Sequence, residues 1–465
     1  MHNTSATLLT EQALPAHITQ ALHTAGVAFS VHSLDTLNPA LHLHQVLLED
    51  NGRQLLVIVP RTHIINITQL NASTNGTWRA PKPSTMTKLL AGLQLNNLPT
   101  LPQLLKLESC YDPAILQQPT AYINSGIAGL VIGLEPAALQ QLLSGSQALE
   151  CAKVITEHQP TQDCISGDAE RIQEAVVRLT SRRIHQRLEE TLEIPLLNDT
   201  AQKILRLRND AMAGADELAA IVETDPALAA QVMAWASSPY YAVPGKIRSV
   251  EDAIVRVLGF DRVINLALGL SMGKSLTLPT DQPQHMQPYW QQAIYTAALI
   301  EGLTRTLPVP NKPEVGLAYL AGLLHNFGFA LLAHIFPPHY ALICRSLEAN
   351  THLSHSVVEY HVLGVTRAQM GAWLMQCWHI PDELVHALRF QDTPSYQGEH
   401  AVYANLTCLA QRLLLQYHNG LSAYSSVPDT LYQNLAIHAD SAQLTLQQVL
   451  DAEQALRALV AQFNP

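Results

Sequence analysis

Hydrophobic and polar residues follow two different periods over the first third of the chain. Residues 45–59 read as a strand, an Asp-Asn-Gly turn at residues 50–52 and a second strand, which is typical of a β-hairpin. An apolar run at residues 127–134 predicts a buried strand, followed by a helix that begins at Glu135 and Pro136. A further helix is expected over residues 13–25. We therefore predict an α/β domain, a mixed sheet with helices, over residues 1–157.

A linker and connecting helix are predicted at residues 158–192. Pro, Thr, Asp, Ser and Gly cluster between residues 158 and 168, and a helix is expected from Asp168 onward. Its apolar face repeats at helical spacing, at Ile172, Ala175, Val176 and Leu179. The same helix carries four arginines, which fit either a solvated face or a docking surface for an acidic partner: Arg178, Arg182, Arg183 and Arg187.

Residues 193–465 show helical periodicity and no alternating strand pattern, which predicts an all-α domain. An amphipathic helix over residues 250–258 is bounded by Ser249, which forms a capping box with Asp252, and by Gly259. Three further residues read as caps and tight turns with a structural role: Asp225, Pro226 and Ser238.

The composition fits a soluble protein of two or three domains. The chain has 465 residues, of which 48% are hydrophobic, and a formal net charge of −11. Such an acidic chain disfavours non-specific nucleic-acid binding, which needs a basic footprint. The N-terminus lacks the basic and apolar regions of a signal peptide, and the clear apolar runs are too short to span a bilayer. We expect a cytoplasmic protein with no membrane association.

Cysteine and histidine spacing give no firm metal site. The six cysteines are scattered without a CxxC spacing, which argues against a zinc site or a disulfide framework. Some of the 21 histidines cluster, but such residues more often cap helices or satisfy buried polar groups than bind metal. We predict no metal and no cofactor. The clusters are His42 with His44; His352, His355 and His361; and His379 with His386.

Seven short motifs between about residue 190 and the early 420s carry a family resemblance. In chain order they are Ile194-Pro195, Glu223-Thr224-Asp225-Pro226, Ala236-Ser237-Ser238, residues 249–253, residues 258–261, residues 321–326 and residues 378–381. Together they resemble the HDOD domain, a helical relative of the HD metal-dependent phosphohydrolases. The resemblance implies a role in signal transduction or regulation.

HD enzymes hold divalent metals through histidines, an adjacent His-Asp pair and a later Asp. Neutral imidazoles bind the metal, a carboxylate offsets its charge, and a metal-bound water becomes the nucleophile. At the matching positions this chain has one imidazole among amides and an arginine: Gln292, His325, Asn326, Arg367, Gln391 and Asn405. Asn326 supplies no negative charge and Arg367 adds a positive one. The pattern favours a non-enzymatic protein, with a residual metal-dependent phosphohydrolase as an alternative.

Two interpretations of these six residues stay open. They could line a degenerate pocket that binds an anion, such as a phosphate or a nucleotide. Alternatively, they satisfy one another's hydrogen bonds at the end of a helical bundle.

The N-terminal third carries a second resemblance, on residues 46–52, 58–70 and 122–134. It is similar to the YbaK/prolyl-tRNA deacylase family, which hydrolyses amino acids from mischarged tRNA. The family's lysine is missing, and His44 or Gln45 stands in its region, while the glycine-containing loop survives as Ser125 and Gly126. These four residues are the candidate pocket of the domain.

The charge of this domain bears on tRNA binding. Residues 1–157 contain seven Lys and Arg against nine Asp and Glu, and a tRNA site needs local positive charge. The resemblance therefore implies a degenerate domain that binds a small ligand or a partner, with aminoacyl-tRNA deacylation as the alternative. For the whole chain we predict a cytoplasmic, bacterial-type regulatory protein. It acts through an unknown protein partner or an anionic small ligand.

Overall fold

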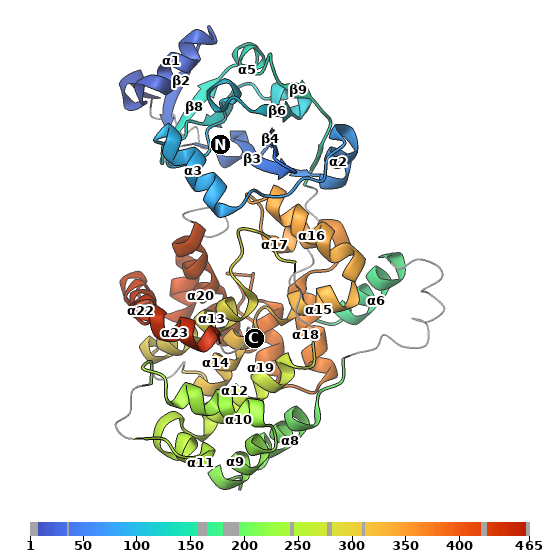
Figure 1. Ribbon diagram of the computed structural model, residues 1–465, viewed down its shortest axis with the longest axis vertical. Coiled ribbons are helices and arrows are strands. Elements are labelled where there is room, and N and C mark those ends of the chain that lie inside the picture. Colours follow the sequence, from blue (N-terminus) through green and yellow to red (C-terminus); the bar gives the residue numbers. More distant parts are fainter. Residues whose placement is uncertain are drawn as a thin grey trace. The chain divides into compact units, whose positions relative to one another are not determined.

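The computed structural model describes residues 8–34, 37–155, 165–179, 195–241, 246–276, 281–308, 312–419 and 426–461 (Figure 1). The chain divides into two compact units. Unit 1 comprises Met1–His158, Asp281–Met286 and Ala341–Val358, and unit 2 comprises Gln159–Thr280, Gln287–Tyr340 and Glu359–Pro465. This division differs from the predicted domains, because two pieces of the range 193–465 belong to unit 1. Most of the predicted linker, with Arg182, Arg183 and Arg187, lies outside the described residues.

Unit 1 is the predicted mixed α/β structure. One sheet has the order β1(Leu8–Leu9), β2(Ser30–Ser33), β8(Leu130–Leu134), β7(Ala121–Asn124), and all of its pairs are antiparallel. A second has the order β3(Leu43–Asp50), β4(Arg53–Pro60), β6(Glu108–Tyr111), β9(Gln147–Ala148), antiparallel only between β3 and β4. A third pairs β5(His63–Ile65) with β10(Ala152–Val154).

Local sequence explains the β3–β4 hairpin and the start of strand β8 in unit 1. Asn51 and Gly52 both have positive φ, 50° and 87°, as a two-residue type I′ turn requires, so the predicted hairpin is confirmed as β3 and β4. Strand β8 begins at Leu130, later than predicted, because residues 125–129 form a turn with Gly126 and Gly129 at positive φ.

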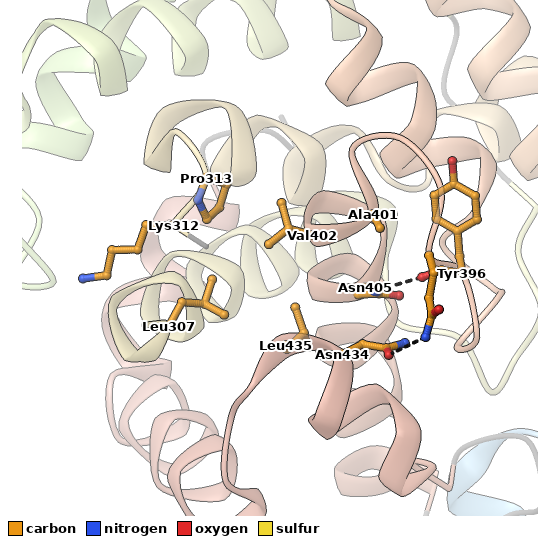
Figure 2. Close-up of a pocket in the computed structure, with 10 residues that line it drawn as sticks. Leu307, Lys312, Pro313, Tyr396, Ala401, Val402, Asn405, Asn434 and Leu435 are labelled. Carbon is orange, nitrogen blue, oxygen red and sulfur yellow. Dashed lines mark hydrogen bonds between the residues drawn. The ribbon is translucent and has the colours of Figure 1, made fainter. Parts of the chain in front are cut away.

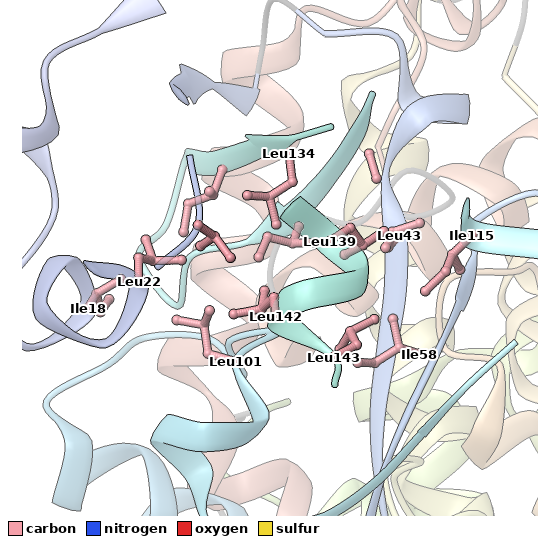
Figure 3. Packing of buried hydrophobic residues seen from close by; sticks show 14 of the residues in the cluster. Ile18, Leu22, Leu43, Ile58, Leu101, Ile115, Leu134, Leu139, Leu142 and Leu143 are labelled. Atoms are coloured by element: carbon pink, nitrogen blue, oxygen red, sulfur yellow. The ribbon is translucent and has the colours of Figure 1, made fainter. Parts of the chain in front are cut away.

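A hydrophobic core joins sheet and helices in unit 1 (Figure 3). Ile18 and Leu22 of α1 pack with Leu139 and Leu142 of α5 and with Ile58 of β4. The helices of this unit are α1(Ala16–Thr24), α2(Ile67–Thr74), α3(Pro83–Leu93), α4(Pro102–Leu105) and α5(Pro136–Leu142). Helix α1 starts three residues later than predicted, because Pro15 provides the extended residue before it.

Unit 2 is helical in the part of the chain that the structure describes, as predicted. Its elements are α6(Asp168–Leu179), α8(Asp199–Arg208), α9(Ala215–Glu223), α10(Pro226–Ala236), α11(Val250–Asp252), α12(Phe260–Gly273), α13(Tyr289–Thr306), α14(Val315–Leu324), α15(Phe327–Ile335), α18(Arg367–Cys377), α19(Asp382–Arg389), α20(Ala401–Asn419), α21(Asp429–Leu435), α22(Ala439–Asp451) and α23(Glu453–Val460). Helices α16(Pro337–Ala349) and α17(His355–Leu363) each have residues in both units.

The predicted caps hold their helices. The Asp225 carboxylate accepts the N–H groups of Ala227 and Leu228, and the Ser249 hydroxyl accepts the N–H of Asp252 at 3.0 Å. Gly259 ends its helix with φ 82°. The helix after Ser249 differs from the prediction in being α-helical only over α11, with a π-helical stretch at Ala253–Leu258.

Close helix crossings build the centre of unit 2. A Cβ on Gly322 of α14 would lie 2.6 Å from the Cα of Ala297 on α13. A Cβ on Gly328 of α15 would lie 1.8 Å from the carbonyl oxygen of Arg367 at the start of α18. Only glycine allows these backbones to approach so closely. As a result, the beginnings of α15 and α18 lie side by side.

Helices α14 and α15 together are apolar enough to resemble a membrane span. The stretch Val315–Ile335 is long enough and apolar enough to cross a membrane, but 94% of its most apolar part is buried inside the protein. This burial fits the core helix of a soluble protein.

Candidate functional site

The predicted HD-type positions lie on the central helices of unit 2. Gln292 is on α13, His325 and Asn326 form the junction of α14 and α15, and Arg367 is the first residue of α18. Gln391 follows α19, and Asn405 is on α20. Five of the six are buried: His325, Asn326, Arg367, Gln391 and Asn405.

Three of these side chains form a continuous chain of hydrogen bonds. The Arg367 Nη1 donates to Asn326 Oδ1 at 3.0 Å, and Asn326 Nδ2 donates to Gln292 Oε1 at 3.3 Å. Gln292 Nε2 in turn donates to the carbonyl oxygen of Gln287 at 2.5 Å. Asn326 thus uses both ends of its amide on neighbours from two other helices.

A carboxylate that the sequence pattern did not reveal completes this group. Glu359 of α17 is fully buried and forms an ion pair with the Nε of Arg367, and its other oxygen accepts the Arg367 backbone N–H at 2.9 Å. The Arg367 guanidinium also lies 4.2 Å from the centre of the Phe329 ring. Burial raises the pKa of Glu359, although Arg367 acts in the opposite direction. Its position eight residues before Arg367, one helix earlier, gave no motif to find it by.

His325 is a neutral imidazole in this environment. Its Nδ1 lies 2.7 Å from the carbonyl oxygen of Gly322, so Nδ1 carries the proton and donates. Burial lowers the pKa of His325 to about 4, and Arg367 acts in the same direction. Gln391 Nε2 donates to the backbone carbonyl of His325 at 2.9 Å, and Gln391 Oε1 accepts from Gln411 at 2.7 Å.

Asn405 is engaged elsewhere. Its Nδ2 donates to the carbonyl oxygen of Tyr396 at 3.1 Å, beside a pocket of about 520 Å³ (Figure 2). Its Oδ1 is buried and has no hydrogen-bond partner among the described residues. Apolar side chains and amides line this pocket, including Leu307, Val402, Asn434 and Leu435. The five other predicted residues are absent from its lining.

The donor chemistry of this group suits hydrogen bonding better than metal binding. Within the described residues no three His, Cys, Asp or Glu side chains gather where they could hold a metal ion. The guanidinium of Arg367 stands against Asn326 Oδ1, an atom that a dication would otherwise need. A cation at this point would have to displace that hydrogen bond, and a guanidinium offers no lone pair to bind a metal in return.

In unit 1 the structure separates the four predicted pocket residues. His44 and Gln45 are neighbours on β3, so their side chains point to opposite faces of the sheet. Gln45 Nε2 donates to the Leu98 carbonyl at 3.0 Å, and its Oε1 accepts from the Thr100 hydroxyl at 3.2 Å. His44 Nε2 instead lies 3.2 Å from the carbonyl oxygen of Ala349.

Ser125 and Gly126 shape a turn that is already filled. The Ser125 hydroxyl is fully buried and donates to the Leu130 carbonyl at 2.7 Å. The Gly126 carbonyl accepts two N–H groups, those of Asn96 and Asn97, each at 3.0 Å. Gly126 and Gln45 therefore both contact the segment of residues 96–100, whereas His44 points to the other face of β3. The prediction of one pocket around all four residues overlooked the alternation of side chains along β3.

Comparison with known proteins identifies the helical domain. The HDOD domain family model matches residues 194–394. The crystal structure of a candidate signal transduction protein from Marinobacter aquaeolei VT8 is 36% identical, with a TM-score of 0.89, covering 97% of this chain and all of that chain. A hydrogen bond joins two of the family motifs in this structure: Trp378 Nε1 donates to the carbonyl oxygen of Pro195 at 2.7 Å.

Two further similarities are more limited. An uncharacterized protein of Treponema pallidum (strain Nichols) is 22% identical over 266 residues, which is 56% of this chain and 50% of that one. This chain therefore spans half the length of that curated relative. The crystal structure of a candidate trans-editing enzyme for prolyl-tRNA synthetase is 16% identical with a TM-score of 0.26, covering 31% of this chain and 99% of that chain. On the family match and the full-length similarity, this chain belongs to the HDOD family, with its HDOD domain at residues 194–394.

Proposed function

We propose that this protein is a non-catalytic signal-transduction protein of the cytoplasm, in which the HDOD domain acts by binding a protein partner and not by turnover. The observation that carries the proposal is the hydrogen-bonded series from Glu359 through Arg367 and Asn326 to Gln292. Gln292, Asn326 and Arg367 are the residues predicted at HD metal-ligand positions, and each is hydrogen-bonded to another side chain. The similarity to a candidate signal transduction protein supports the regulatory part of the proposal.

Anion binding is the weaker reading of the same residues. Arg367 retains one buried nitrogen, Nη2, without a partner among the described residues. The adjacent Glu359 carboxylate, however, neutralises the guanidinium, so an incoming phosphate gains little net attraction. We therefore favour protein binding over an anionic small ligand.

The metal content of the purified, untagged protein tests the non-catalytic reading. Elemental mass spectrometry is expected to find far less than one equivalent of iron, manganese or zinc. One equivalent or more, lost on His325→Ala, would overturn the proposal.

Substitution toward the enzyme pattern gives the matched comparison. Asn326→Asp alone is expected to give no phosphohydrolase activity, because Gln292, Arg367 and Gln391 still offer no imidazole. The fourfold variant Gln292→His, Asn326→Asp, Arg367→His, Gln391→His should gain metal affinity. Turnover by Asn326→Asp alone would show that the remaining ligands are already present.

A titration with tRNA tests the alternative for the N-terminal domain. Weak binding at physiological salt is expected. Sub-micromolar affinity that falls steeply as salt is raised would instead favour aminoacyl-tRNA deacylation.

A further inference from the structure

Residues of the HDOD match take part in the structure of unit 1. Ala341–Val358 falls inside the matched range 194–394, yet these residues belong to unit 1 together with Met1–His158. Within that unit, residues 345–352 form hydrogen bonds with β3, with β5 and with Ala80, which precedes α3. We call residues 345–352 the latch.

The latch covers the free edge of β5. Among the described strands β5 pairs with β10 alone, so its other edge would be left open. The Ile65 N–H donates to Asn350 Oδ1 at 2.7 Å, and Asn350 Nδ2 donates to the Ile65 carbonyl at 3.1 Å. One carboxamide thereby makes both hydrogen bonds that a residue of a neighbouring strand would make. Two residues earlier on the same edge, the His63 carbonyl accepts from His352 Nε2 at 2.9 Å.

The latch also covers His44. Because the Ala349 carbonyl can only accept, the bond at 3.2 Å places the proton of His44 on Nε2. The rings of His44 and His352 stack with their centres 3.7 Å apart. Ala349 itself is buried in the hydrophobic cluster of Val57, Ile65 and Trp78.

A buried carboxylate fixes the helical end of the latch. The two oxygens of Glu348 accept the backbone N–H groups of Ala80 and Gln284, each at 2.9 Å. Arg345 lies 3.1 Å from Glu348 and 2.9 Å from Asp281. All of these residues are members of unit 1.

At β5 the side chains of the latch take the place of a neighbouring strand. Asn350, His352 and Glu348 all bind main-chain atoms of unit 1, and the atoms on β5 are those that any extended peptide would use. We propose that residues 345–352 form an intramolecular latch over a strand-accepting edge, and that an opened latch lets β5 take an extended peptide segment of a partner protein. The latch works in this way whether or not the HDOD domain turns over a substrate.

Amide hydrogen exchange on the unmodified full chain tests whether the latch opens. The Ile65 N–H depends on Asn350, whereas the neighbouring Ile64 is paired with Lys153 of β10 and serves as an internal control. Under native conditions the backbone N–H of Ile65 is expected to exchange at least tenfold faster than that of Ile64. The backbone N–H of Asn350 should exchange at the same rate as that of Ile65. Exchange of all three only at the rate of global unfolding would overturn the proposal, because the segment would then be a permanent part of the core.

Peptide binding tests what the edge accepts. The probe is a fluorescent peptide of residues 346–353, Ser-Leu-Glu-Ala-Asn-Thr-His-Leu, and a second peptide has Leu in place of Asn350. The full chain with Asn350→Leu and His352→Ala should bind the first peptide at least tenfold more tightly than the unmodified chain does. Because an extended segment pairs with β5 through its main chain, the second peptide should bind too, and binding of the first peptide alone would contradict strand addition.

Asn198→Leu in unit 2 is the matched control. Like that of Asn350, the Asn198 side-chain amide donates to a backbone carbonyl, that of Ser271, and accepts from a backbone N–H, that of Ala201. This variant should bind the peptide as weakly as the unmodified chain. Equal binding by all three proteins, or no binding by a folded latch variant, would contradict a strand-accepting edge. If the latch variant does not fold, the exchange measurement on the unmodified chain still decides the matter.

Discussion

The Arg367 cluster of unit 2, made of Gln292, Asn326, Glu359 and Arg367, and the latch of unit 1 both bury polar side chains, but the hydrogen-bond partners of these side chains differ. In the cluster, side chains bind side chains, and an ion pair between Arg367 and Glu359 lies at the centre. In the latch, side chains bind the main chain of a strand edge. A cluster of the first kind cannot exchange one partner without leaving a buried charge unpaired. The second kind presents its partners to any extended segment, so it is better suited to a reversible contact.

The largest expected effect comes from breaking the ion pair of the cluster. Glu359→Gln removes the carboxylate that is paired with the buried Arg367 cation, and we expect a loss of about 3–5 kcal/mol in the free energy of unfolding. Chemical denaturation measures this loss. The double variant Glu359→Leu, Arg367→Met should recover most of it, since both charges are then gone.

Glu453→Gln provides the control for this experiment. Glu453 pairs with the exposed Arg457 at 2.7 Å, and an ion pair in contact with solvent contributes little to stability. A loss for Glu359→Gln as small as the loss for this control would mean that Arg367 is hydrated and the cluster is open to solvent.

A middle-sized effect is expected from acidification. The pKa of His325 is lowered to about 4, and the pKa of His44 to about 3, by burial in each case. Each folded pKa lies below the unfolded value of about 6.5, so below pH 6.5 the histidine takes up a proton in the unfolded state while it stays neutral in the folded state. The free energy of unfolding therefore has its full value above pH 6.5 and decreases as the pH falls below it. At pH 5 each histidine should account for a loss of about 2 kcal/mol.

Urea denaturation between pH 7 and pH 4.5 measures this dependence. Burial raises the pKa of Glu348 and of Glu359, so these two carboxyl groups add stability as the pH falls, opposite to the histidines. The pH dependence of each histidine variant is therefore compared with that of the unmodified chain. His44→Asn and His325→Asn should each flatten the pH dependence. A variant whose curve runs parallel to that of the unmodified chain would show that its histidine stays hydrated in the folded state.

The smallest effect is expected at Gln45, which shares β3 with His44 but faces the other side. Gln45→Leu removes the bonds to Leu98 and Thr100, and a loss of about 1 kcal/mol is expected. A thermal melt measures it, with the exposed Gln69→Leu on α2 as the control. The exchange rate of Ile65 should stay unchanged in Gln45→Leu, and an increase would mean that the two faces of β3 are coupled.

Much of the local structure was predictable because it depends on nearby residues. Asn51 and Gly52 select the hairpin turn, Asp225 and Ser249 cap their helices, and Gly259 ends one. The positions of Gln292, Asn326 and Arg367 came from the order of motifs along the chain, and the structure brings these three side chains into contact. The grouping of Gln45 with His44 was not justified, because a strand directs adjacent side chains to opposite faces.

The fold class and the HDOD family could be predicted from the sequence alone, since they follow from residue types and short spacings. Only the tertiary structure showed that Glu359 neutralises Arg367 and that Asn350 and His352 cover β5. The physical reason is the distance along the chain. Asn350 lies 285 residues from Ile65, and a contact between a side chain and a backbone leaves no periodicity or motif, because the main-chain atoms it uses are the same in every residue.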